Sequence, residues 1–143
     1  MVELGTSVAG PYAGWVLAAL GARVVKIERF GKGDDIRYWG PPFWRNTSTM
    51  FHTYNRGKKS LEVDLKDAEQ VSALRDWIVS DADVVLQNLR PGVVKRAGLE
   101  AATLCVRNPE LIYCNVRAYG DACLLYTSPS PRDVEESRMP SSA

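Results

Sequence analysis

The sequence is poor in the residues that build metal centres and disulfide frameworks. It has one histidine, His52, and three unevenly spaced cysteines, Cys105, Cys114 and Cys123, with no C-x-x-C pair. A single histidine argues against a His-based metal site, and such cysteines are typical of reduced thiols in a cytoplasmic protein. We therefore expect no metal cofactor and a cytoplasmic location.

Long apolar runs and an excess of charge of one sign are also missing. No run approaches the roughly 20 apolar residues of a membrane span, and the N-terminus lacks the basic-then-apolar pattern of a signal peptide. The formal net charge is +1, which gives no reason to expect nucleic acid or an acidic membrane surface as a partner. With 143 residues, 45% of them hydrophobic and 24% charged, the chain has the length and composition of one ordinary globular domain.

The N-terminal stretch from Val2 to Glu28 predicts a strand–helix–strand unit. A short apolar run at 2–4 is followed by a helix that opens at Gly10 and Pro11, where the missing N–H of proline has no partner to lose. Gly21 closes the helix, and the β-branched run at 24–27 has strand length. Such a unit implies two parallel strands joined by a right-handed crossover.

The turn at residues 5–10 lies where open α/β sheets bind ligands. Free backbone N–H groups and the helix dipole favour anions there. The turn lacks the G-x-G-x-x-G spacing of dinucleotide-binding loops, and Pro11 stands where a P-loop carries lysine. Two interpretations stay open at this point: an anion-binding loop, or a tight turn that packs a helix on a sheet.

Residues 29–44 are expected to form a long loop without regular structure, because they contain three glycines and the pair Pro41–Pro42. Long loops in compact domains often carry function. The alternative is a loop pinned by its aromatic side chains, with its charges in solvent. The adjacent Asp34 and Asp35 side chains should diverge in an extended segment, which is poor geometry for a metal clamp.

Further along the chain, helix-like and strand-like segments alternate. We expect helices at 47–55, 68–80, 93–97 and 101–106, and strands at 60–65, 83–86 and 111–116. This alternation argues for an α/β fold with a parallel sheet. His52 falls on the polar side of the first of these helices, so we expect a surface or loop-packing residue rather than a catalyst.

Polar residues follow several of the expected strands and should share one edge of the sheet. They lie at Ser7–Val8, at 88–90 and at 117–119, and a basic turn at 56–59 precedes another strand. Cations and free backbone N–H groups at such an edge would suit a ligand that carries phosphates. From the residues alone, we expect an anionic, nucleotide-like ligand.

The composition changes after Ala122, where residues 123–143 read CLLYTSPSPRDVEESRMPSSA. One interpretation is a disordered Ser/Pro-rich tail. A more specific one is that 123–133 and 137–143 match the translated ends of a transposase-type sequencing adaptor, with 134–136 where a sample index would stand. We therefore expect a non-native, disordered tail at 123–143 that is not part of the folded domain.

Five ordered motifs carry a resemblance to a known family. They are VAGPYAGWVLAALGARVVKIER, GKGDDIRYWGPPF, YNRGKKSLEVDLK, ADVVLQNLRPGVVKRAGL and NPELIYCNVRAYG. In this order and spacing, the sequence resembles the class III CoA-transferases (the CaiB–BaiF family), which also contain the α-methylacyl-CoA racemases. The resemblance covers essentially all of residues 1–122 and is far more specific than any single glycine loop.

The resemblance implies an α/β fold with a Rossmann-like parallel sheet. Residues 1–122 would be the N-terminal part of the large domain, here a partial CoA-binding domain. In the family this domain is split in sequence around a small domain, and two subunits interlock like chain links, which implies a homodimer. The implied substrates are coenzyme A, as an acyl-CoA ester, and a carboxylic acid.

Carried over position by position, the resemblance also implies a set of CoA-contacting residues. Arg37 and Arg96 would pair with phosphates, the strand edge at 63–66 would seat the adenine, and the turn at Asn88 would offer backbone N–H groups. The transferase branch can carry a polar side chain at the position of Val8, and its absence here weakens a formyl- or oxalate-type assignment. The full set is Val8, Ala9, Arg37, Val63, Asp64, Leu65, Lys66, Asn88, Leu89, Arg90 and Arg96.

The resemblance leaves two activities open. In the transferases, an aspartate carboxylate attacks the acyl-CoA thioester, a mixed anhydride forms, and CoA or the acyl group passes to an acceptor carboxylate. In the racemases, an acid/base pair removes the α-proton of the thioester. The CoA-transferase is the favoured interpretation and the racemase or isomerase the alternative.

The catalytic residues of both branches lie downstream of Tyr119 and Gly120 in the family. We therefore expect no catalytic residue within 1–122. Four aspartates of this stretch, at 34, 35, 64 and 121, are not at the motif position of the nucleophile. The chain as given is expected to be an inactive half-domain and at best a weak CoA binder.

Overall fold

A parallel five-stranded sheet is the frame of the computed structural model, which describes residues 1–117. The order across the sheet is β5-β2-β1-β6-β7, and every neighbouring pair is parallel. The α/β fold predicted from the sequence is therefore confirmed. The expectations about Tyr119, Gly120, Asp121 and the tail at 123–143 lie outside the described residues. The five strands are β1 (Val2–Leu4), β2 (Val25–Arg29), β5 (Lys59–Val63), β6 (Val84–Gln87) and β7 (Ile112–Asn115).

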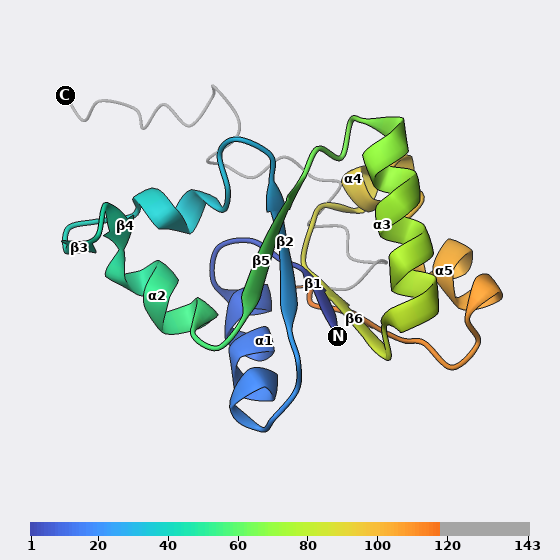
Figure 1. Ribbon diagram of the computed structural model, residues 1–143, viewed down its shortest axis with the longest axis horizontal. Helices are drawn as coiled ribbons and strands as arrows, with labels where there is room; N and C mark the ends of the chain where they lie inside the picture. Colours follow the sequence, from blue (N-terminus) through green and yellow to red (C-terminus); the bar gives the residue numbers. More distant parts are fainter. Residues whose placement is uncertain (118–143) are drawn as a thin grey trace, which may run out of the picture.

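Helices cover both faces of this sheet (Figure 1). On one face lie α1 (Ala9–Ala19) and α2 (Thr49–Asn55). On the other lie α3 (Ala68–Asp81), α4 (Pro91–Arg96) and α5 (Ala101–Arg107). Sheets of this kind bind ligands outside the carboxyl ends of their strands, where the turns that enter the helices gather.

The apolar core lies on the side of α3, α4 and α5. Alternate residues of the strands point to that side, so Val2 and Leu4 of β1 join the α3 residues Leu74 and Ile78 in one buried cluster. Burying a side chain of this size contributes roughly 1.5–3 kcal/mol. The opposite side of the same strands carries charged residues, which are described below.

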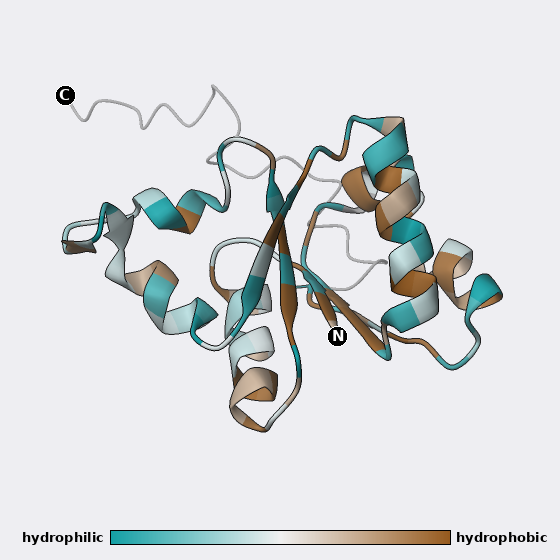
Figure 2. Cartoon of the chain, in the orientation of Figure 1, coloured by the Kyte–Doolittle hydropathy of each residue, from teal (hydrophilic) through white to brown (hydrophobic). Residues whose placement is uncertain are grey.

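Helix α1 packs on the sheet through its smallest residues. Gly10, Pro11 and Gly14 are buried, whereas Tyr12 is 50% exposed. The helix has no charged residue, and Figure 2 accordingly shows it pale to brown over its length. Small residues on the inner side let the helix approach the strands closely, and they leave its large apolar side chains facing outward.

The loop predicted at 29–44 contains regular structure, so that expectation is wrong in part. A 3-10 turn, η1 (Asp35–Tyr38), is capped by Asp34, whose carboxylate accepts from Ile36 N at 3.1 Å. Next, β3 (Phe43–Trp44) pairs with β4 (Thr47–Ser48) as an antiparallel hairpin. Its two turn residues, at 45 and 46, have φ of 49° and 61°, which is the backbone that a two-residue hairpin requires.

Candidate functional site

The turn after β1 and the turn after β6 meet at the carboxyl edge of the sheet, as the sequence predicts. Asn88 joins them, because its Oδ1 accepts from Thr6 N at 2.8 Å and its Nδ2 donates to Thr6 O at 3.0 Å. A Cβ at Gly10 would lie 3.0 Å from Asn88 Oδ1, so a larger residue there would push the turns apart. Val8 and Ala9 are exposed beside this clamp, which leaves the turn accessible to a ligand.

A buried lysine lies beneath the same turn. Lys26 Nζ is 2.8 Å from Asp34 Oδ2 and 3.0 Å from Glu3 Oε1, and it donates to Gly5 O at 2.6 Å. The three charged side chains are at most 1% exposed. Because taking charges out of water is costly, such a cluster is tolerated only when every group is paired. The sheet register brings the pair together, since Glu3 and Lys26 are direct neighbours on β1 and β2.

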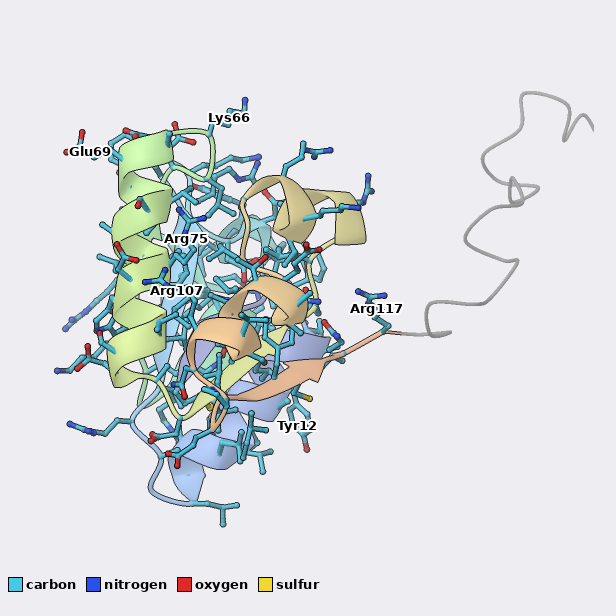
Figure 3. The ribbon with its side chains drawn as sticks, turned by 90° about the vertical axis from the view of Figure 1, so that its right-hand side faces the viewer. Tyr12, Lys66, Glu69, Arg75, Arg107 and Arg117 are labelled. Atoms are coloured by element: carbon cyan, nitrogen blue, oxygen red, sulfur yellow. The ribbon has the colours of Figure 1, made fainter. Side chains whose placement is uncertain are left out.

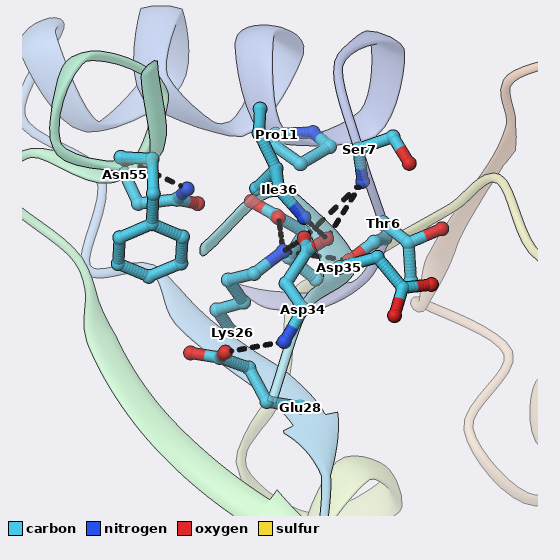
Figure 4. Close-up of polar contacts among 12 residues, drawn as sticks. Thr6, Ser7, Pro11, Lys26, Glu28, Asp34, Asp35, Ile36 and Asn55 are labelled. Carbon is cyan, nitrogen blue, oxygen red and sulfur yellow. Dashed lines mark hydrogen bonds and ion pairs between the residues drawn. The ribbon is translucent and has the colours of Figure 1, made fainter. Parts of the chain in front are cut away.

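Asp34 connects this cluster to the turn after β1 (Figure 4). Its carboxylate oxygens accept from Ser7 N at 3.0 and 3.2 Å. Ser7 has a φ of 63°, which is unfavourable for a residue with a side chain. Such a backbone conformation persists only when the surrounding structure fixes it. Asp35 points elsewhere and pairs with Arg29 at 3.0 Å, with both side chains about half exposed. The predicted divergence of the two aspartates is confirmed.

Lys58 extends the cluster to α1 and α2. Its Nζ is 2.7 Å from Glu3 Oε2, and it donates to Pro11 O at 2.7 Å and to Asn55 Oδ1 at 3.0 Å. Burial lowers the pKa of Lys58, although the charge of Glu3 opposes this. Its side chain is 2% exposed, so the predicted basic turn does not present this lysine to a phosphate. Gly14 makes the room, because a Cβ there would overlap the Glu3 carboxylate.

The ion pair of Glu28 and Arg37 closes the cluster toward η1. Arg37 Nε and Nη2 donate to Glu28 at 2.6 and 2.7 Å, and the guanidinium lies 3.7 Å from the centroid of the Phe51 ring. Burial would raise the pKa of Glu28, but hydrogen bonds from Arg37, Ser60 and the backbone of Asp34 outweigh it and lower this pKa from 4.5 to about 2. The Arg37 side chain is 29% exposed. Its role as a CoA contact stays a prediction.

The charged strand residues Glu3, Lys26 and Glu28 were missed by sequence reasoning. A signal was present, because V-E-L at 2–4 and V-K-I-E at 25–28 alternate apolar and charged residues. In adjacent parallel strands, this alternation puts the charges on one face. They support the turn from below, whereas the exposed residues of the turn are the ones that can touch a ligand.

A cavity of about 330 Å³ opens between α3 and α4 and has the character of an anion site. Four cations lie in its wall together with no acidic side chain. None of these cations has an ion pair or a side-chain hydrogen bond within residues 1–117. The lining residues are Leu65, Lys66, Ala68, Val71, Arg75, Lys95, Arg96, Ala97 and Gly98.

This cavity gathers part of the predicted CoA set and adds two residues to it. Leu65, Lys66 and Arg96 were predicted and lie together here; Arg75 and Lys95 were not. Arg75 sits in the middle of α3, and no motif distinguishes it in the sequence. Only the packing of α3 beside α4 brings it to the other cations.

The remaining predicted CoA contacts are spread along the same edge. Val63 is 5% exposed and belongs to the core, so its side chain faces away from solvent. Asp64 is half-buried, and its Oδ1 accepts from the backbone of Lys66 at 2.9 Å. Leu89 is half-buried and Arg90 is exposed in the turn after β6. Their contact with CoA stays a prediction.

A second cavity, of about 400 Å³, lies between α1, the β3–β4 hairpin and α2. His52 packs against its wall: the ring centroid is 4.9 Å from that of Trp44, and Nε2 is 3.2 Å from Trp44 O. The expected loop-packing role of His52 is confirmed. The cavity is lined by Trp15, Trp44, Thr49, His52, Thr53 and Arg56.

Residues 1–117 show neither a metal-ligand cluster nor a membrane-spanning helix. Within this range, no three His, Cys, Asp or Glu side chains are placed to hold a metal ion. None of the helices in this range combines the length with the hydrophobicity of a membrane span. Cys105 and Cys114 are free thiols, and Cys123 lies outside the described residues.

Comparison with known proteins identifies the family to which this chain belongs. The family model described as CoA-transferase family III matches residues 1–130. A succinate–glutarate CoA-transferase of Agrobacterium fabrum is 40% identical over 126 residues, which cover 84% of this chain and 31% of that protein. A succinyl-CoA:glutarate CoA-transferase of Mus musculus is 40% identical over 120 residues, covering 84% of this chain and 27% of that one.

Solved structures agree with the sequence comparison. The crystal structure of a CaiB/BaiF family protein from Brucella suis superposes with a TM-score of 0.77 at 41% identity, over 83% of this chain and 32% of that chain. The chain thus spans about a third of the length of the relatives that it matches.

Proposed function

Because the chain belongs to CoA-transferase family III, we propose that it forms the CoA-binding part of an enzyme that moves CoA between an acyl-CoA thioester and a carboxylic acid. The observation that supports this most is the cavity between α3 and α4, with four cations and no acid in its wall. CoA carries a diphosphate and a 3′-phosphate, and a site with several unpaired cations suits such a ligand.

In the proposed complex, CoA lies along the carboxyl edge of the sheet. Its nucleotide end occupies the cavity beside Lys66 and Arg96. Its pantetheine arm extends toward the exposed turn at Val8 and Ala9. Hydrogen bonds from this turn to Asn88 and Asp34 hold the turn in place. Because the turn is preorganised, binding loses less conformational entropy than it would with a flexible turn.

The chemistry that we propose follows the transferase branch of the family. An aspartate attacks the thioester carbonyl, CoA leaves as the thiolate, and a mixed anhydride forms. The thiolate then attacks the aspartyl carbonyl and releases the donor carboxylate, and the acceptor carboxylate takes CoA by the same two steps in reverse. The names of these relatives suggest dicarboxylic acids of the size of succinate or glutarate as donor and acceptor.

The buried carboxylates of residues 1–117 are not suited to be that nucleophile. Asp34 and Glu3 are buried against Lys26, and Glu28 is held by Arg37. In the family the nucleophile lies downstream of Tyr119 and Gly120, so we propose that the aspartate lies outside the described residues. The exposed apolar side of α1, with Tyr12, Val16 and Leu17, supports the further proposal that other parts of a homodimer cover it.

Calorimetric titration of the 143-residue chain with CoA tests the proposal. We expect saturable binding that weakens at least tenfold in the double variant Lys66→Gln/Arg96→Gln, because two charged contacts are lost. Arg107→Gln is the matched control, since that cation pairs with Asp76 at 2.8 Å outside the cavity. Absence of binding, or equal binding by the double variant, would contradict the proposed site.

A further inference from the structure

We propose that Arg75 and Lys95 make the cavity between α3 and α4 selective for the 3′-phosphate of CoA. This inference rests on the proposed function, because it assigns a specificity to the site that CoA would occupy. The two residues lie in the cavity wall with Lys66 and Arg96, and no motif or resemblance assigned a role to either of them.

Arg75 has no structural partner that would explain it. Its helical neighbours three and four residues away are Val71, Ser72, Ile78 and Val79, so no acidic side chain is placed for an ion pair along α3. The adjacent Asp76 pairs with Arg107 of α5 instead. In Figure 3, Glu69 lies on the side of α3 that faces away from α4. Arg75 is thus a half-buried cation without a carboxylate.

The backbone opposite Arg75 is shaped to receive its guanidinium. Gly98 follows α4 with a φ of 61°, and a Cβ there would lie 3.0 Å from Arg75 Nη1. Glycine therefore serves two purposes at this position: it adopts the left-handed backbone that ends the helix, and it leaves space for Arg75. The Arg75 guanidinium therefore lies close beside the turn after α4, at the wall of the cavity.

Lys95 and Arg96 have an alternative explanation that covers only half of the cluster. Both lie in the last turn of α4, where cations complement the helix dipole. That effect is small for a helix of 6 residues, and it does not involve Lys66 or Arg75, which come from the preceding strand–helix unit. Four like charges without a counter-charge repel each other, so their assembly favours an anionic ligand.

The charge of the cluster fits a phosphomonoester better than a diphosphate. A phosphomonoester concentrates nearly two negative charges at pH 7 and three acceptor oxygens on one phosphorus, whereas the CoA diphosphate spreads its two charges over two phosphate groups. The 3′-phosphate is also at the end of CoA that is most distant from the thioester. The cavity between α3 and α4 is correspondingly separate from the clamped turn after β1, where we place the pantetheine arm.

Titration of the 143-residue chain with CoA and with 3′-dephospho-CoA tests this inference. We expect the wild type to bind CoA at least tenfold more tightly than dephospho-CoA. Arg75→Gln and Lys95→Gln should each weaken CoA binding severalfold to about tenfold, the effect of one charged hydrogen bond, and leave dephospho-CoA binding nearly unchanged. Arg75→Lys should restore part of the preference, and Arg107→Gln should leave it intact.

The outcomes separate the two proposals. If CoA and dephospho-CoA bind equally well, the selectivity is overturned while CoA binding stands; if neither binds, the proposed function fails and the selectivity fails with it. If a variant that keeps the wild-type circular dichroism loses both ligands by the same factor, the residues act only through general electrostatics and the inference is overturned. Competition by inorganic phosphate at the affinity of CoA would also overturn it, because the cavity would then be an unspecific anion site.

Discussion

The ion pair of Arg37 and Glu28 allows a sharp test of how the candidate site is held together. The resemblance assigns Arg37 to CoA, whereas the structure uses two of its N–H groups on a carboxylate that is 1% exposed. The variant Arg37→Gln keeps a polar side chain and removes the charge. It therefore separates a structural role, read in stability, from a ligand role, read in affinity.

The expected loss follows from the pKa of Glu28. Partners of this carboxylate lower its pKa from 4.5 to about 2, and Arg37 makes the largest of the lowering contributions. At about 1.4 kcal/mol per pKa unit, the whole set of partners stabilises the folded state by about 3 kcal/mol. Arg37→Gln should thus lower the free energy of unfolding by about 2 kcal/mol at pH 7. Arg29→Gln is the control, because its pair with Asp35 is about half exposed and should contribute at most about 1 kcal/mol.

The lowered pKa of Glu28 also fixes the direction in which stability changes with pH. Glu28 has a lower pKa in the folded than in the unfolded state, so its stabilisation is complete above pH 4.5 and is lost as the pH falls toward 2. In Arg37→Gln the folded-state pKa of Glu28 rises, and the stability gap to the wild type should shrink between pH 7 and pH 3. Urea unfolding followed by circular dichroism measures both. A gap below about 0.5 kcal/mol at pH 7, or one that is the same at both pH values, would refute the reasoning.

Three further predictions concern the neighbouring residues. Gly14→Ala should destabilise the fold by about 1–3 kcal/mol, because the added Cβ overlaps the Glu3 carboxylate. Helix propensity alone predicts the opposite, a gain of up to about 1 kcal/mol. A variant with increased stability in thermal unfolding would therefore contradict the close approach of α1 to the sheet. Lys26→Met should cost about 3–5 kcal/mol, because it leaves two buried carboxylates without their shared cation, and Asp34→Asn in the same chain should recover part of the loss in urea unfolding. Burial raises the pKa of Tyr113 to about 12, so its ultraviolet titration should lie well above that of exposed tyrosines, and a midpoint near 10 would show that the ring is accessible.

The regular elements could be predicted because local signals for them are strong. The strand at 2–4 and the helix from Ala68 appear in the structure within a residue or two of the prediction, since hydrophobic period and capping residues act over short distances. The hairpin at 43–48 was missed because the turn at Arg45 and Asn46 carries no glycine. The backbone there adopts positive φ without the glycine that usually marks such a turn in a sequence.

The site was predicted where it depends on the order of elements and missed where it depends on packing. Strand order places the turn after β1 beside Asn88, and the sequence predicted that meeting. The cluster around Lys26 required the register of β1 against β2, and the cavity required Arg75 to lie opposite Gly98. Sequence separation hides such contacts, because residues far apart meet only when helices and strands have packed.

By itself, the sequence determined the α/β class, most helices and strands of the main sheet and the family, because each depends on local pattern or on the order of motifs along the chain. Only the tertiary structure decided which charges are available to a ligand. Lys26 and Lys58 form ion pairs with buried carboxylates, whereas a second group of cations lines a cavity without a counter-charge: Lys66, Arg75, Lys95 and Arg96. The physical reason is that a charged side chain is either paired in the interior or left to solvent and ligand, and that choice depends on burial, which only packing creates.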